Sequence, residues 1–194
     1  MNISTTTHRP ETTRGFTLVE LLMAVSLSSF VLAGVLTTNL HLVRGGIRIT
    51  QYAEMDSQVR RGYEQLGHDL KIATGITWNG TSDITLTIPN SSGVTAQVTY
   101  AWTSATQSLF MVPGTSSAVS VGRVYLVQGI PPLAGGAPGL TFARFDRNGV
   151  AATTDLATKR IQVRMTVSRQ SGTAATATAN AVSVTFILRN KLVG

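Results

Sequence analysis

The sequence contains no cysteine. A disulfide framework, a thiolate nucleophile and a metal site with cysteine ligands are therefore excluded. Processing as a lipoprotein, which requires a cysteine, is excluded as well. Any folded domain of this chain must be held together by its core alone.

Charged residues are few, and acidic residues are fewer than basic ones. Charged residues make up 13% of the chain, with nine acidic against sixteen basic residues and a formal charge of +7. With 43% hydrophobic residues, the composition is that of a folded protein and not of a disordered one. The basic surplus permits contact with nucleic acid, anionic lipid or an acidic partner, but it identifies none of them.

Residues that carry enzymatic or metal chemistry are few. The three histidines, His8, His41 and His68, have no spacing that suits a pair of metal ligands, and HExxH is missing. His68, beside Asp69, is predicted to lie on a solvated helix face. No nucleophile elbow, P-loop or dinucleotide fingerprint occurs, and residues 146–149, DRNG, predict a hairpin turn and not a calcium loop. We therefore expect no catalytic residue, no metal site and no cofactor.

A long apolar run follows a polar amino-terminal segment. Residues 16–36, FTLVELLMAVSLSSFVLAGVL, contain one charge and one glycine. As a helix they rise about 31 Å, which matches a hydrocarbon core of ~30 Å. A buried core helix and a secretory signal peptide are the alternatives, but the run is long for either, and residues 31–33, VLA, lack the first small residue of a signal cleavage site. Because Arg9 and Arg14 precede the run, the amino terminus is predicted to stay cytoplasmic while the rest crosses.

Glu20 is the one charged residue in this run. A carboxylate inside an apolar span costs about 2.5–3.5 kcal/mol on insertion scales, so an unpaired one is rare. If the chain is cut between Gly15 and Phe16, the new amine of Phe16 lies close to the depth of Glu20. The amine of a neighbouring subunit could then neutralise this carboxylate. The alternative is an acidic side chain that reaches the headgroup region.

Residues 14–22, RGFTLVELL, resemble the prepilin cleavage and methylation signature of type IV pilins and type II secretion pseudopilins. The resemblance implies that a prepilin peptidase cuts after Gly15 and methylates the amine of Phe16, leaving 179 residues. It implies that Glu20 guides the subunit into a filament, with other pilins, the peptidase and an inner-membrane assembly platform as partners. The implied location is the bacterial inner membrane, in a single pass with the carboxyl-terminal domain outside the cytoplasm, and then the pilus or pseudopilus.

Periodicity divides the rest of the chain. We predict a leader over residues 1–15, a membrane or filament-core helix over 16–43, an amphipathic helix over 44–75 and one β-rich domain over 76–194. Gly45-Gly46 predicts a kink or a short melted region. In the amphipathic helix, apolar or small residues at steps of three and four predict a stripe that packs on a sheet: Tyr52, Met55, Val59, Gly62 or Tyr63, Leu66, Leu70 and Ala73.

Beyond residue 75, apolar residues alternate with polar ones, which predicts strands with one buried face. The alternating segments are 84–88, 94–102, 161–167 and 182–188, and further strands are expected near 107–112, 121–128 and 140–146. Asn79-Gly80 and Asn148-Gly149 are signals for tight turns. Residues 129–139 and 172–180 are predicted loops. The predicted class is α+β, with a long helix on an antiparallel sheet in a type IV pilin-like fold.

Two further segments resemble a subgroup of this family. Residues 66–73 and 140–149 resemble minor pilins of the PilW kind and the related J-type pseudopilins. The chain lacks the early-helix proline and the carboxyl-terminal disulfide loop of common major pilins, which favours a minor subunit in the complex that starts or caps a filament. The alternatives are a type II secretion pseudopilin, a tip-borne module that binds DNA or a surface, and an anchored hydrolase.

Basic residues recur in the second half of the chain. Some alternate with core positions and are expected to line an outer sheet face, where they could meet DNA phosphates during uptake. No aromatic residues are interleaved with them for base stacking. An ordinary solvated face or a subunit contact is the alternative for this set, which comprises Arg123, Arg144, Arg147, Lys159, Arg160, Arg164 and Arg169.

Overall fold

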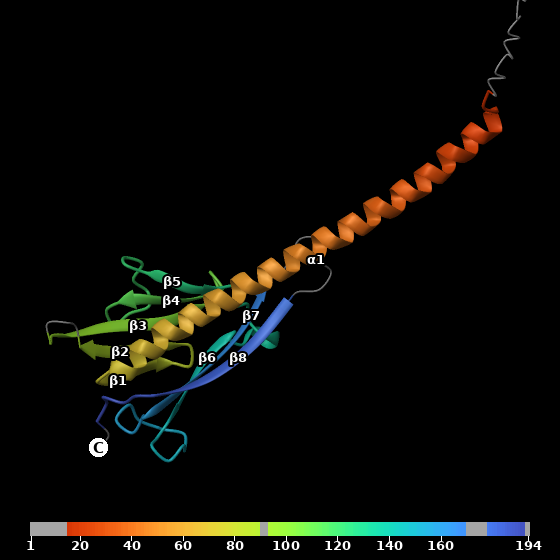
Figure 1. Ribbon diagram of the computed structural model, residues 1–194. Coiled ribbons are helices and arrows are strands. Elements are labelled where there is room, and N and C mark those ends of the chain that lie inside the picture. Colours follow the sequence, from red (N-terminus) through yellow and green to blue (C-terminus); the bar gives the residue numbers. More distant parts are fainter. Residues whose placement is uncertain (1–14, 90–92, 170–177, 193–194) are drawn as a thin grey trace, which may run out of the picture. The chain divides into compact units, whose positions relative to one another are not determined.

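The computed structural model describes residues 15–89, 93–169 and 178–192, and the chain divides into two compact units, residues 1–46 and 47–194. One helix, α1 (Leu18–Ile72), contributes to both units (Figure 1). It is followed by strands that all pair antiparallel, so the predicted α+β class is confirmed.

The strands of the described residues form two sheets in the second unit (Figure 1). The larger sheet has the order β1-β2-β3-β4-β5 and the smaller one the order β6-β7-β8. Each sheet is a meander, because every strand pairs with the next one along the chain. The strands are β1 (Gly75–Gly80), β2 (Asp83–Pro89), β3 (Thr95–Thr103), β4 (Ser108–Pro113), β5 (Val124–Gln128), β6 (Leu140–Phe145), β7 (Arg160–Arg169) and β8 (Thr178–Ile187).

The helix continues through Gly45 and Gly46, so no melted region interrupts it there. Two glycines lower helix propensity by about 2 kcal/mol. However, extending an existing helix needs no new nucleus, and long helical segments flank both residues. The expectation of a melted segment at this point was therefore wrong.

The first strand and its turn differ from the prediction. The sequence pattern predicts no strand over residues 75–80, where the structure has β1. Asn79-Gly80 ends this strand, and Thr81-Ser82 forms the turn that joins it to β2. By contrast, Asn148-Gly149 lies in a turn after β6, where Gly149 has a φ of +88° that favours glycine.

The two predicted loops have different outcomes. Residues 129–139 do connect β5 to β6, with a short helix, η1 (Ala134–Gly136), between them. Residues 172–177 lie outside the described residues, whereas 178–180 belong to β8. The second predicted loop is therefore too long at its carboxyl end, because the Ala/Thr composition continues into the strand.

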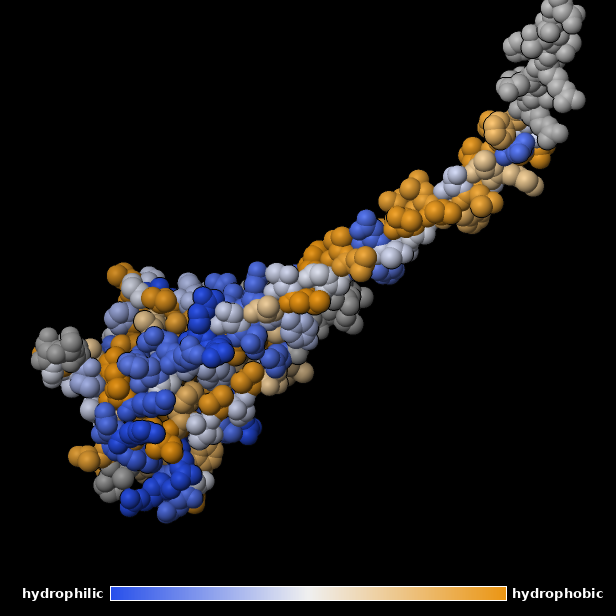
Figure 2. Space-filling view, in the orientation of Figure 1, coloured by the Kyte–Doolittle hydropathy of each residue, from blue (hydrophilic) through white to orange (hydrophobic). Residues whose placement is uncertain are grey.

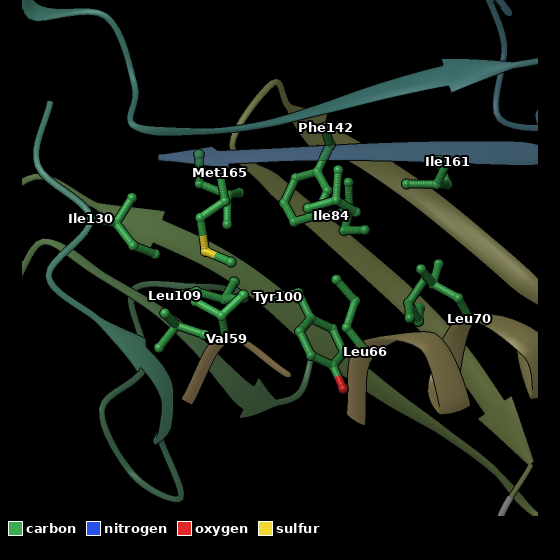
Figure 3. Close-up of a cluster of buried hydrophobic side chains, with 14 of the residues drawn as sticks. Val59, Leu66, Leu70, Ile84, Tyr100, Leu109, Ile130, Phe142, Ile161 and Met165 are labelled. Carbon is green, nitrogen blue, oxygen red and sulfur yellow. The ribbon is translucent and has the colours of Figure 1, made fainter. Parts of the chain in front are cut away.

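The core of the second unit lies between the carboxyl half of α1 and both sheets (Figure 3). The predicted stripe is largely confirmed, but Tyr52 is 48% exposed because the buried part of the helix begins a turn later, at Met55. Burial of each large apolar side chain contributes about 1.5–3 kcal/mol. The core side chains labelled in Figure 3 are Val59, Leu66, Leu70, Ile84, Tyr100, Leu109, Ile130, Phe142, Ile161 and Met165.

The larger sheet buries side chains on both of its faces. Three consecutive residues of β3, residues 99–101, are all buried, and Ala101 packs in a separate cluster with Phe110. The guanidinium of Arg123 covers that cluster, 4.2 Å from the centroid of the Phe110 ring. Val94 and Ala96, which alternation predicts to face the core, are exposed. A single buried face over 94–102 was therefore a wrong prediction.

Tyr63 ties α1 to the outermost strand of the smaller sheet. Its hydroxyl donates to the carbonyl oxygen of Val182 at 3.3 Å, and its ring stacks on Phe186 with centroids 6.2 Å apart. Burial raises the pKa of Tyr63 to about 12 from 10.0. Between these two pH values the unfolded chain loses a proton that the folded chain keeps. Stability is therefore lost as the pH rises through this window.

We expect Tyr63→Phe to lose about 1 kcal/mol of unfolding free energy at neutral pH, through the missing hydrogen bond. Its stability should also fall less steeply than that of the wild type between about pH 10 and 12. Urea unfolding of the full chain in detergent, followed by the fluorescence of Trp78 and Trp102, measures both effects. An unchanged slope would assign the pH dependence to other groups, such as Tyr100, whose pKa burial also raises.

Candidate functional site in the amino-terminal segment

The predicted cleavage position lies just outside α1. Residues 1–14 of the predicted leader fall outside the described residues, whereas Gly15, Phe16 and Thr17 precede the helix. The Phe16 side chain is 83% exposed, and the space around Gly15 is open. The Gly15–Phe16 peptide bond is therefore in exposed, non-helical backbone.

Thr17 caps the amino-terminal end of the helix, in a role that the sequence reasoning missed. Its Oγ1 accepts a hydrogen bond from the backbone N–H of Glu20 at 3.2 Å. Thr-x-x-Glu is the capping-box pattern, so this signal was present in the sequence. The carboxylate of Glu20 stands in the first turn, where the helix dipole favours a negative charge by about 0.3–1 kcal/mol. The cap also orders the segment that separates Glu20 from Phe16.

The first unit presents apolar side chains on all sides. Every residue from Gly15 to Gly46 is exposed, and Figure 2 shows the predominance of hydrophobic side chains along this part of the helix. Within the described residues, α1 is long and apolar enough to cross a membrane. Hydroxyl groups in this part bond to backbone carbonyls three or four residues earlier, which satisfies them without water. These donors are Ser26, Ser29, Thr37 and Thr38, at 2.8–2.9 Å.

Asp69, in one segment that resembles minor pilins, has a structural role in the second unit. It is 5% exposed and accepts hydrogen bonds from the Tyr100 hydroxyl at 2.5 Å and from Gln65 Nε2 at 3.3 Å. Burial, and then the Asp69 carboxylate, raise the pKa of Tyr100. The neighbouring His68 side chain is 68% exposed. The predicted solvated face is therefore right for His68 and wrong for Asp69.

Arg144, in the other such segment, lies on the core side of the smaller sheet. It is paired across the strands with the buried Ile161. Its Nη1 is 2.6 Å from Asp155 Oδ1, and its guanidinium is 5.0 Å from the centroid of the Trp78 ring. The prediction of an outer-face position was wrong for this residue, because strand alternation places it on the same face as the core positions of β6.

Only some of the remaining basic residues lie close to one another. Arg160 and Arg164 do alternate with the core positions of β7, and Arg164 is exposed. Arg160 Nη2 donates to the carbonyl oxygen of Arg147 at 2.9 Å, so these two residues lie together. Lys159 instead donates to a backbone carbonyl near the carboxyl terminus, at 2.6 Å. The side chain of Arg169 lies outside the described part of the chain, and contact with DNA stays a prediction.

Comparison with known families bears on the amino-terminal segment. Residues 12–36 match the family model described as the prokaryotic N-terminal methylation motif. A comparison with curated proteins found no match. The motif implies processing by a prepilin peptidase and assembly of pilins into filaments in general, and with the apolar helix it indicates membrane anchoring. This motif, followed by a long helix and antiparallel sheets, supports a type IV pilin-like prepilin.

Proposed function

We propose that the chain is a minor pilin, a non-catalytic subunit of a type IV pilus-like filament that belongs to the complex starting or capping it. The observation that carries this proposal is the placement of Glu20. It is the single charged residue in the exposed apolar run 16–36, one capped turn beyond the exposed Gly15–Phe16 bond. A carboxylate in that position is costly in lipid unless another group neutralises it.

The proposed mechanism is lateral docking of membrane helices. The peptidase cuts after Gly15, and the new amine of Phe16 is methylated while it keeps its positive charge. This amine pairs with Glu20 of an adjacent subunit, which neutralises both charges as the helices pack. The chain makes one membrane pass, with its sheets outside the cytoplasm. An inner-membrane assembly platform then moves the packed subunits into the filament.

The minor role is supported by the two segments that resemble minor pilins. In the structure both are parts of the fold: Asp69 joins the helix to Tyr100, and Arg144 joins β6 to Asp155. A type II secretion pseudopilin is the alternative within this class, and the neighbouring genes would separate the two. A tip module that binds DNA is the alternative of another class, and salt-sensitive binding of duplex DNA would favour it.

We expect Glu20→Gln to leave cleavage intact and to reduce the amount of this protein in sheared filaments by about tenfold or more. The amide keeps the shape of the side chain but cannot neutralise a neighbouring amine, and tenfold corresponds to about 1.4 kcal/mol. Quantitative immunoblotting of the filament and membrane fractions measures the effect.

Asp56→Asn is the matched control, because it removes an exposed acid from the same helix beyond the apolar run. It should leave incorporation unchanged. If Glu20→Gln entered filaments as well as the wild type, charge pairing at this position would not drive docking.

A further inference from the structure

A groove of about 500 Å³ runs between the carboxyl half of α1 and the outermost strand of the larger sheet, within the second unit. The absence of a side chain at Gly62 allows this close approach, since a Cβ there would lie 2.5 Å from Val127 Cγ2. The groove is lined by Gln58, Arg61, Gly62 and Gln65 of α1, Met111 of β4, and Val124, Tyr125, Leu126 and Gln128 of β5.

Several polar side chains that line the groove make no hydrogen bond to the described part of the protein. Within the described part of the chain, neither the amides of Gln58 and Gln128 nor the hydroxyl of Tyr125 has a hydrogen-bond partner. Gln65 donates to the buried Asp69, which holds its amide in place. Side-chain amides suit the backbone of an extended peptide, because each carries both a donor and an acceptor.

The charge of the groove is positive, and it comes from Arg61. None of the lining residues is acidic. Arg61 Nε donates to the carbonyl oxygen of Ser57 at 3.3 Å, and no carboxylate of the described residues lies within ion-pair distance of its guanidinium. Its neighbour Arg60 lines a different hollow and pairs with Glu64 at 3.0 Å. Arg61 therefore has a free guanidinium fork, the geometry that binds a carboxylate.

Strand β5 limits how a ligand can bind. It ends the five-stranded sheet, but its pairing with β4 shifts at Leu126, so its edge carries a bulge. A bulge twists an edge strand and discourages continuous strand addition. Recognition in this groove must therefore rely on its side chains, among them the apolar Met111 and Val124.

We propose that this groove binds an extended, carboxylate-bearing peptide segment of a partner protein. The carboxylate pairs with Arg61, and the peptide backbone bonds to the amides of Gln58 and Gln128. Apolar side chains of the segment contact Met111 and Val124. The assignment stands on charge complementarity and on unused hydrogen-bonding groups, and it holds whether or not the chain enters a filament.

The test uses the full chain in detergent micelles and fluorescent peptides of two compositions. One peptide alternates threonine with glutamate, and the other alternates threonine with glutamine. Fluorescence anisotropy should show that the glutamate peptide binds at least about tenfold more tightly. Arg61→Gln should remove this preference, and Gln58→Ala should weaken both peptides. Arg60→Gln, which removes an equal charge from the next position, should change neither affinity.

Three results would overturn the proposal. One is the absence of measurable binding of the glutamate peptide to the wild type. Another is an equal loss of affinity in Arg60→Gln and Arg61→Gln, which would show a general effect of net charge. The third is displacement of the peptide by duplex DNA with the same dependence on Arg61, because the site would then select phosphate over carboxylate.

Discussion

Replacing Gly15 with alanine is expected to leave the chain uncut in cells that contain the prepilin peptidase. The matched methylation motif spans this position, and the Gly15–Phe16 bond is the proposed cleavage point. A Cβ at Gly15 would meet no atom of the described protein within 4 Å, apart from the adjoining residues. The substitution should therefore act on recognition by the peptidase and not on the fold of the chain. Mass spectrometry of the membrane fraction should find the mass of the full 194 residues in place of the 179 that begin at Phe16.

Gly45→Ala is the matched control for this experiment. A Cβ at Gly45 likewise meets open space, but this residue lies in the interior of α1 and far along the chain from the cut. Its variant should mature like the wild type and, because alanine favours a helix by about 1 kcal/mol, should not be less stable. Normal maturation of Gly15→Ala at Phe16 would show that the cleavage position is wrongly assigned.

Gly139→Ala is expected to cause the largest loss of stability, about 3 kcal/mol, at the upper end of the range for overpacking. A Cβ at this position would lie 2.0 Å from the carbonyl oxygen of Pro131 and 2.9 Å from Ile130 Cγ2. The backbone cannot easily move away, because the carbonyl of Gly139 accepts a hydrogen bond from Thr166 N–H at 2.9 Å. Urea unfolding in detergent measures the loss, since Trp78 and Trp102 both lie in the sheets.

Gly80→Ala provides the comparison for this substitution. Its Cβ would meet nothing within 4 Å, and its φ lies outside the left-handed region. The expected change is within about 0.5 kcal/mol, as for ordinary surface substitutions. Equal stabilities of the two alanine variants would contradict this prediction. They would show that the loop before β6 moves aside for the Cβ, so that the contact with Pro131 costs no stability.

Much of the fold could be predicted from the sequence, because the signals are local. The stripe from Met55 to Ala73 predicts a helix face that the structure buries, and the alternation over 161–167 predicts the buried face of β7. The alternating pattern gave a wrong prediction for β3. The second face of this strand is also buried, in a separate cluster that Arg123 covers. The pattern also missed β1, because this strand has only two large apolar residues, Ile76 and Trp78, and ends in the turn signal Asn79-Gly80.

The sequence by itself determined the amino-terminal region of this protein. A helix able to span a membrane needs only a continuous apolar run. The motif covers residues 12–36, which include the predicted cleavage position and Glu20, so no distant contact is needed to find them. Tertiary structure alone decided which polar residues are structural. Asp69 meets Tyr100 across 31 positions, and Arg144 meets Asp155 over Trp78. Such side chains meet only after the helix and sheets have packed. The same packing forms the groove beside Arg61, which no local sequence pattern predicts.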